Sequence, residues 1–189
     1  PTALALTNTV SSIAENTSTS SRIKVADIAI TDDALGTNTI TLSGADAASF
    51  EVVGTELFLK AGTALDFESK NSYALTLSAS DSSLPGSTPV AAAFSLALSD
   101  VNEPPTALVL TNTVSSIAEN TSTSSRIKVA DIAITDDALG TNTITLSGAD
   151  AASFEVVGTE LFLKAGTALD FETKAAYSVQ VRVADRLLP

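Results

Sequence analysis

One feature constrains this chain more than any other: its sequence repeats. Residues 6–68 recur without change as residues 110–172, an offset of 104 positions. A repeat of this length is close to the most common size of a folded domain. The chain of 189 residues is therefore expected to form two copies of one domain. We place these domains at residues 1–104 and 105–189.

The pattern of apolar residues within each copy predicts an all-β fold. Short alternating runs are separated by turn residues, and a change of parity near Ala26 and Asp27 predicts a β-bulge. About seven short strands in roughly 100 residues are typical of an immunoglobulin-like Greek-key β-sandwich. The strands are expected at residues 3–6, 10–13, 22–30, 39–43, 50–53, 56–60, 72–80 and 90–99.

The second copy stops before its expected last strand. Pro189 corresponds to Pro85, and nothing in the second copy corresponds to Val90–Ser99. The second sandwich therefore lacks its last strand in this chain. Either it has an open edge, or that strand comes from elsewhere.

Composition excludes several classes of function. The net charge is −12, which argues against nucleic acids and anionic membranes as partners, and no apolar run is long enough to insert into a membrane. The chain contains no Cys and no His, so zinc, copper or iron sites and triad catalysis lack their usual groups. The chemistry that remains uses oxygen ligands, which suit Ca²⁺ or Mg²⁺. We do not expect an enzyme, because Asp66 and Glu68, the nearest match to a glycosidase pair, lie at a domain junction.

The joint between the copies is acidic and stiff. Asp100, Asn102 and Glu103 offer oxygen ligands on a short extended segment, and Pro104 and Pro105 end it. This composition predicts a junction that a hard cation locks. Without a cation, so many neighbouring carboxylates would repel one another.

Three motifs resemble those of the cadherin repeat, in its bacterial cadherin-like form. They are Ala14-Glu15-Asn16, Leu65-Asp66-Phe67-Glu68 and Asp100-Val101-Asn102-Glu103-Pro104. The resemblance covers nearly all of residues 1–105, and the second copy repeats the first two motifs. It implies two tandem cadherin-type sandwiches with Ca²⁺ as the cofactor.

The resemblance also implies a ligand set on each side of the joint. The base of the first domain would supply carboxylates, with Asn102 adding an oxygen: Glu15, Asp66, Glu68, Asp100 and Glu103. The top of the second domain would supply Asp136, Asp185 and the backbone carbonyl of Asn142.

One position departs from the family pattern. When Gly140 and Asn142 are aligned with the family, its second Asp falls on Ala138. Asp137 either substitutes for it or faces water. The sets at the two far ends lack a linker, so we expect half-sites there: Glu119, Asp170 and Glu172 in the second domain, and Asp32, Asp33 and Asp81 in the first. Asp46, Glu51 and Glu56 match no motif and are expected on a solvated face.

These observations favour a non-enzymatic, extracellular or cell-surface function. The leading hypothesis is a Ca²⁺-rigidified repeat of a long bacterial surface or secreted adhesin, whose partners are neighbouring repeats, with homotypic or carbohydrate contacts as further options. One alternative is a subunit of an extracellular filament or surface layer, assembled through strand pairing at the open edge. Another is a carbohydrate-binding module, which requires exposed aromatic side chains.

Overall fold

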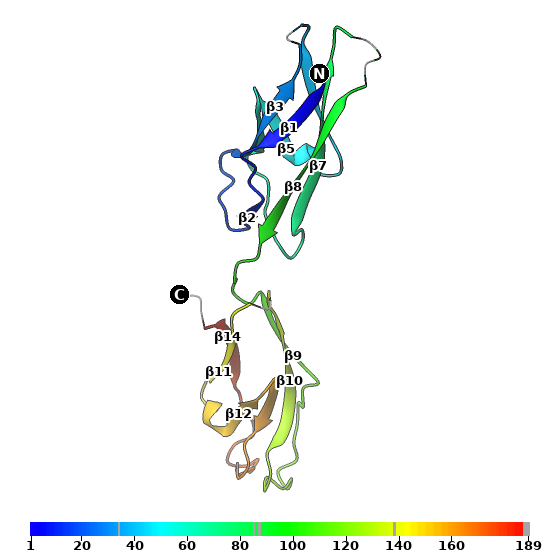
Figure 1. The fold of residues 1–189 in the computed structure, drawn as a ribbon. Helices are drawn as coiled ribbons and strands as arrows, with labels where there is room; N and C mark the ends of the chain where they lie inside the picture. The colour runs from blue at the N-terminus through cyan, green and yellow to red at the C-terminus, as the bar shows by residue number, and fades with distance from the viewer. Residues whose placement is uncertain (34, 85, 87, 138, 187–189) are drawn as a thin grey trace. The chain divides into compact units, whose positions relative to one another are not determined.

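The computed structural model describes residues 1–33, 35–84, 86, 88–137 and 139–186. The chain divides into unit 1 (Pro1–Val101) and unit 2 (Asn102–Pro189). This division falls three residues before the predicted domain boundary. Each unit is described by itself below, with the strands labelled as in Figure 1.

Unit 1 is a sandwich of two four-stranded sheets. The first sheet has the order β1-β3-β6-β5, with β1 (Ala3–Thr7), β3 (Ile23–Thr31), β6 (Glu56–Leu59) and β5 (Phe50–Val53). The second has the order β2-β8-β7-β4, with β2 (Ser12–Ala14), β8 (Val90–Ser99), β7 (Ser72–Asp81) and β4 (Asn38–Ser43). The predicted all-β sandwich is therefore confirmed, with every expected strand of the first copy present.

Local sequence explains the irregular points of unit 1. The register between β3 and β6 shifts between Lys24 and Ala26, so the predicted bulge lies at Val25. Gly54 and Thr55 form the two-residue loop between β5 and β6, and Gly54 has the positive φ (61°) that such a loop requires. A single 3₁₀ turn, Ala47–Ser49, precedes β5.

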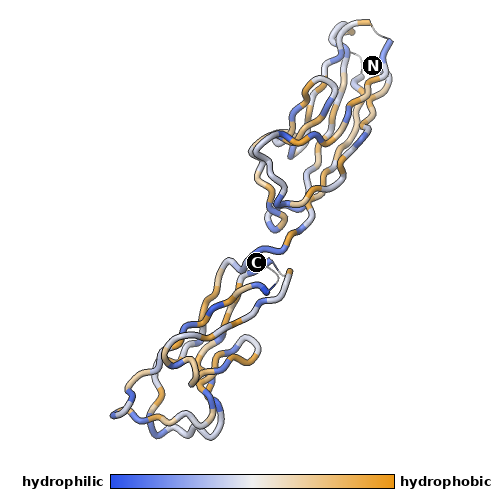
Figure 2. Tube along the Cα trace, turned by 90° about the vertical axis from the view of Figure 1, so that its left-hand side faces the viewer, coloured by the Kyte–Doolittle hydropathy of each residue, from blue (hydrophilic) through white to orange (hydrophobic). Residues whose placement is uncertain are grey.

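The core of unit 1 lies between the two sheets. Figure 2 shows hydrophobic and hydrophilic residues alternating along the chain, as strands with one buried face require. Phe50 packs edge-to-face against Phe94 of β8, with ring centroids 5.8 Å apart, and against Tyr73 of β7 at 6.1 Å. Leu96 of β8 is completely buried. Strand β8 is thus part of the core as well as of the sheet.

Unit 2 repeats the first sheet of unit 1. Its order is β12-β13-β10-β9, with β12 (Phe154–Val157), β13 (Glu160–Leu163), β10 (Ile127–Thr135) and β9 (Ala107–Thr111). The same register shift recurs in β10, between Lys128 and Ala130, and the 3₁₀ turn recurs at Ala151–Ser153. Identical sequence has produced identical local structure.

The second sheet of unit 2 differs from its counterpart. It pairs β11 (Asn142–Ser147) with β14 (Gln180–Asp185), and these two strands are its whole extent in the described part of the chain. Residues 116–118 and 176–179 are not strands, although the equivalent residues of unit 1 belong to β2 and β7. Both segments pair with β8 in unit 1, so without such a strand they lose their backbone partners. The prediction that the second sandwich lacks its last strand is confirmed.

The helical content is small. The described residues contain two 3₁₀ turns of three residues each, and neither these nor any other described segment is a helix able to cross a membrane.

Candidate metal centre

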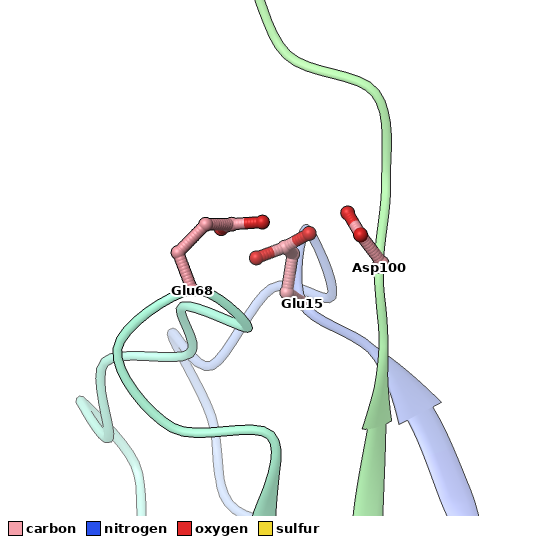
Figure 3. Close-up of side chains that lie close together, drawn as sticks. All are labelled: Glu15, Glu68 and Asp100. Carbon is pink, nitrogen blue, oxygen red and sulfur yellow. The ribbon is translucent and has the colours of Figure 1, made fainter. Parts of the chain in front are cut away.

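Three carboxylates of unit 1 converge at one end of its sandwich. Glu15 follows β2, Glu68 lies in the turn at residues 67–69, and Asp100 follows β8. Each contributes an oxygen that lies within 4.8 Å of the others. Figure 3 shows the three side chains pointing toward one another from these separate segments. Sequence reasoning predicted all three as ligands of one site, and the fold brings them together.

Glu15 organises this cluster. Its side chain is buried, with 6% of the residue exposed, and both carboxylate oxygens accept backbone hydrogen bonds. Oε2 accepts from the N–H of Phe67 at 2.6 Å, and Oε1 accepts from the N–H of Val101 at 2.7 Å. Glu15 therefore joins the turn that carries Glu68 to the segment that carries Asp100. An ionised carboxylate has about four acceptor positions, so these bonds leave room for a cation.

Asp66 lies beside the cluster but interacts within its own turn. Its Oδ1 accepts from the N–H of Ser69 at 2.9 Å, and its Oδ2 accepts from the Ser69 hydroxyl at 2.7 Å. These bonds hold the pKa of Asp66 below its ordinary value, with the Ser69 hydroxyl as the largest cause. Asp66 is outside the group of three, and its role as a ligand stays a prediction.

A second group of oxygens gathers at the end of unit 2 that begins with Asn102. Asn142, the first residue of β11, is the cross-strand partner of Asp185, the last residue of β14. Asp136 directly follows β10, and its Oδ2 accepts from Asn142 Nδ2 at 2.6 Å. Asp185 is buried, and its Oδ1 accepts from the N–H of Thr141 at 3.3 Å. Three predicted ligands of the second domain thus lie at one end of the same sandwich.

This second group contains polar atoms that are buried and unsatisfied. Asn102 Oδ1, Asp136 Oδ1 and Asn142 Oδ1 make no hydrogen bond within the described residues, and neither does Asn102 Nδ2. A buried acceptor without a partner is costly, about 1–3 kcal/mol. Several such oxygens together form a donor set that fits a hard cation such as Ca²⁺.

Gly140 keeps space open between these oxygens. It has a positive φ of 71°, and a Cβ at this position would overlap Asp185 Oδ2 and Asn102 Oδ1. Sequence analysis used Gly140 only to align the loop and assigned Asn142 only a backbone role. The available signal was the repeated Asp-x-x-x-Gly-x-Asn spacing, which recurs at Asp32–Asn38.

Asp137 contacts the linker. Its Oδ2 accepts from the N–H of Glu103 at 2.7 Å, and its Oδ1 accepts from the N–H of Leu139 at 2.9 Å. The loop after β10 is therefore tied to the segment after Asn102. Whether Asp137 and Glu103 are ligands is not tested by these contacts, and both stay predictions.

The two predicted half-sites at the far ends also form clusters. Glu119, Asp170 and Glu172 place oxygens within 4.8 Å of one another, and all three are exposed. In unit 1, Asp32 accepts from Asn38 Nδ2 at 2.7 Å, and the amino group of Pro1 lies 3.1 Å from its Oδ1. These two partners, Asn38 first, lower the pKa of Asp32. Positive charge is thus drawn to the position equivalent to Asp136.

One expectation about the surface carboxylates is wrong. Asp46 was expected on a solvated face, but its Oδ1 lies 2.7 Å from Lys70 Nζ and its Oδ2 accepts from the N–H of Ala74 at 2.8 Å. The ion pair with Lys70 is the main reason that the pKa of Asp46 is lowered. Asp46 therefore anchors the 3₁₀ turn to β7, an interaction between segments that a local motif does not reveal.

The comparisons with known proteins resolve the fold. No protein-family model and no curated protein matches the sequence. Solved cadherin structures do match: human mucin-like protocadherin, extracellular domains 1–2, has a TM-score of 0.63 at 17% identity and covers 97% of this chain and 96% of its own. Human protocadherin-24, domains 1–2, has a TM-score of 0.59 at 18% identity, with 96% and 94% covered.

The third match is a fragment of protocadherin gamma B7, extracellular cadherin domains 1–4, with a TM-score of 0.67 at 18% identity over 97% of this chain. The chain spans less than half of this fragment and of another from the same protein, 49% and 44% of their lengths. The fold is cadherin-like. The predicted resemblance is thus confirmed at the level of the fold, and the acidic clusters of both cadherin-like units are candidates for holding a metal ion.

Proposed function

We propose that this chain is a non-enzymatic, calcium-binding repeat module of a long bacterial surface or secreted adhesin, stiffened by Ca²⁺ at its interdomain joint. The observation that carries the proposal is the group of buried, unsatisfied oxygens of Asn102, Asp136 and Asn142. Ca²⁺ takes about six to eight oxygen ligands in irregular geometry, so it satisfies several such oxygens at once.

Each unit would contribute its own ligands. Unit 1 offers three converging carboxylates, and unit 2 offers the buried carboxylates and amides. The cadherin-like fold supports this assignment, because the predicted ligand positions of the family fall on these residues. The proposed ligands are Glu15, Glu68, Asp100, Asn102, Asp136, Asn142 and Asp185, with Asp66, Glu103 and Asp137 as further predicted contributors.

The mechanical consequence follows from the covalent chain. Asp100 belongs to the ligands of unit 1 and Asn102 to those of unit 2, and two residues of extended chain span at most about 7 Å. Ca²⁺ bound by both residues would remove the backbone freedom of the segment between them. We therefore propose a flexible joint at low calcium and a stiff joint at the higher calcium concentrations outside cells.

Calorimetric titration of the full chain with Ca²⁺ tests the binding. We expect saturable binding at or below millimolar Ca²⁺ and a rise in melting temperature, because the ion binds the folded state. Asp100→Asn and Asp136→Asn should each weaken binding at least about tenfold, a loss of roughly 1.4 kcal/mol. Glu51→Gln is the control, because Glu51 pairs with Arg22 at 3.7 Å, outside both ligand sets.

Two results would contradict the proposal. One is an unchanged melting temperature in millimolar Ca²⁺, and the other is equal affinity in the Asp100→Asn variant and the control. The stiffening itself is measured with one spin label in each unit. Ca²⁺ should narrow the distance distribution and a chelator should broaden it again, whereas equal widths would refute a mechanical role.

The carbohydrate-binding alternative finds little support in the side chains. Phe171 is the one aromatic residue among the large exposed hydrophobics of the described chain, while Phe50 and Tyr73 are buried. A platform for stacking on sugar rings needs several exposed rings. The filament alternative requires an open edge on unit 2, and that edge is considered next.

A further inference from the structure

Unit 2 contains an open groove, which we define by the apolar side chains that line it. The cavity has a volume of about 910 Å³ and is lined by Val114, Ile117, Phe154, Leu163, Tyr177 and Val179, among others. Val114 is 46% exposed, although its equivalent in unit 1, Val10, is packed against the core. A cavity of this size with apolar walls is a binding site in most folded domains.

The identity of the two copies shows what fills this space in unit 1. The equivalent side chains of unit 1 pack against three residues of β8: Phe94, Leu96 and Leu98. These three are 5%, 0% and 4% exposed, so the strand is fully inserted between its neighbours. Phe94 stacks on Phe50, the counterpart of Phe154.

The backbone around the groove is also unpartnered. In unit 1, β7 pairs with β4 on one side and with β8 on the other. Its counterpart β14 pairs with β11 alone among the described strands. A free strand edge beside an apolar groove is the arrangement into which extended peptides insert.

We propose that the open groove of unit 2 binds one extended peptide strand with the pattern of β8. The occupant has an aromatic residue followed by aliphatic residues two and four positions later, with small residues between them. It pairs antiparallel with β14 and the segment before it. By the register of unit 1, which pairs Leu75 with Phe94 and Tyr73 with Leu96, the aromatic residue lies opposite Val179 and the first aliphatic residue opposite Tyr177.

The strand has to come from a partner whose own fold does not use it. A second copy of this chain could insert its β8 only by withdrawing it from unit 1, where Leu96 is completely buried. That exchange opens one groove for each groove it fills, so it gains no buried apolar surface. This inference goes beyond the calcium proposal and rests on different residues.

The test uses the full chain and a labelled synthetic peptide of Val90–Ser99 with a lysine tail for solubility. We expect saturable 1:1 binding by fluorescence anisotropy, and slower hydrogen exchange at residues 176–179 and 116–118. A peptide with Phe94→Asp should bind at least about tenfold more weakly, because the charged side chain would be buried in the groove. A scrambled peptide with the same tail controls for attraction to the acidic chain.

Two variants of the chain make the result specific. Val114→Glu puts a carboxylate at the groove and should abolish binding, whereas Val157→Glu, at an exposed residue outside the lining, should leave it unchanged. Fusing a copy of Gly86–Ser99 after Pro189 should fill the groove, raise the melting temperature of unit 2 and remove peptide binding. The proposal is overturned by equal binding of the scrambled peptide, by full binding to Val114→Glu, or by a chain that dimerises alone and protects the same amides.

Discussion

At the scale of single residues, the two proposed ligand sets differ in how the fold completes them. Glu15 is held by the N–H groups of Phe67 and Val101, so backbone contacts from distant segments fix its carboxylate. Its copy Glu119 accepts from the N–H of Phe171 at 2.9 Å and is exposed. The same residue in the same motif is therefore buried in one unit and exposed in the other, because Val101 follows a strand that unit 2 lacks.

Gly140 gives a prediction at this scale. Gly140→Ala should lower both the stability of unit 2 and its calcium affinity, because the new Cβ overlaps Asp185 and Asn102 oxygens. The matched control is Gly158→Ala, which also has positive φ but meets nothing within 4 Å. The control should lose only the backbone term, about 1–2 kcal/mol, with calcium affinity unchanged. Calorimetric titration and denaturant unfolding measure both effects, and equal calcium affinity in the two variants would refute the role given to Gly140.

At the scale of elements, one strand decides the quality of a whole sheet. Strand β8 pairs with both β7 and β2 and inserts its apolar side chains into the core of unit 1. Without an equivalent, the counterpart of β7 is shortened to Gln180–Asp185 and the counterpart of β2 is not formed. A strand thus depends on its neighbours as much as on its own alternating sequence.

Matched substitutions in the two copies test this dependence. Val25 is completely buried at the bulge of β3, while its copy Val129 is half-buried and lines the open groove. Val25→Ala should reduce the free energy of unfolding of unit 1 by roughly 1–3 kcal/mol, through lost burial and a new cavity. Val129→Ala should reduce that of unit 2 by clearly less. Equal losses in denaturant unfolding would mean that the groove is already filled or collapsed.

At the scale of the whole molecule, two nearly identical sequences form units with unequal cores. Twelve buried residues form the core cluster of unit 1, against five in unit 2 within the described chain. Hydrophobic stabilisation grows with the apolar area removed from water. Unit 2 should therefore be the less stable of the two, although residues 110–172 copy residues 6–68.

Thermal unfolding of the full chain should accordingly show two transitions, with unit 2 melting first. The sequence contains only two tyrosines, Tyr73 in unit 1 and Tyr177 in unit 2. Tyr73→Phe and Tyr177→Phe therefore leave one fluorescent reporter in each unit. Both remove an equivalent hydrogen bond, to the carbonyls of Ala64 and Ala168. Coincident melting of the two reporters would show that the units unfold together or are equally stable.

The sequence by itself determined the all-β class, the two-unit plan and nearly all strand positions. These follow from the repeat and from the period of two in its apolar residues, which are local properties of the chain. The motif spacing also identified Glu15, Glu68 and Asp100 as neighbours. The ends of the strands were less well determined: residues 10–13 were expected as a strand, whereas β2 is Ser12–Ala14.

Only the tertiary structure decided which oxygens are buried and unsatisfied, that Gly140 keeps them apart, and that Asp46 is paired with Lys70. These depend on side chains that meet across segments far apart in the sequence, so no local pattern contains them. The same holds for the open groove. The sequence showed that a strand is missing, but the folded copy in unit 1 was needed to show which side chains its absence exposes.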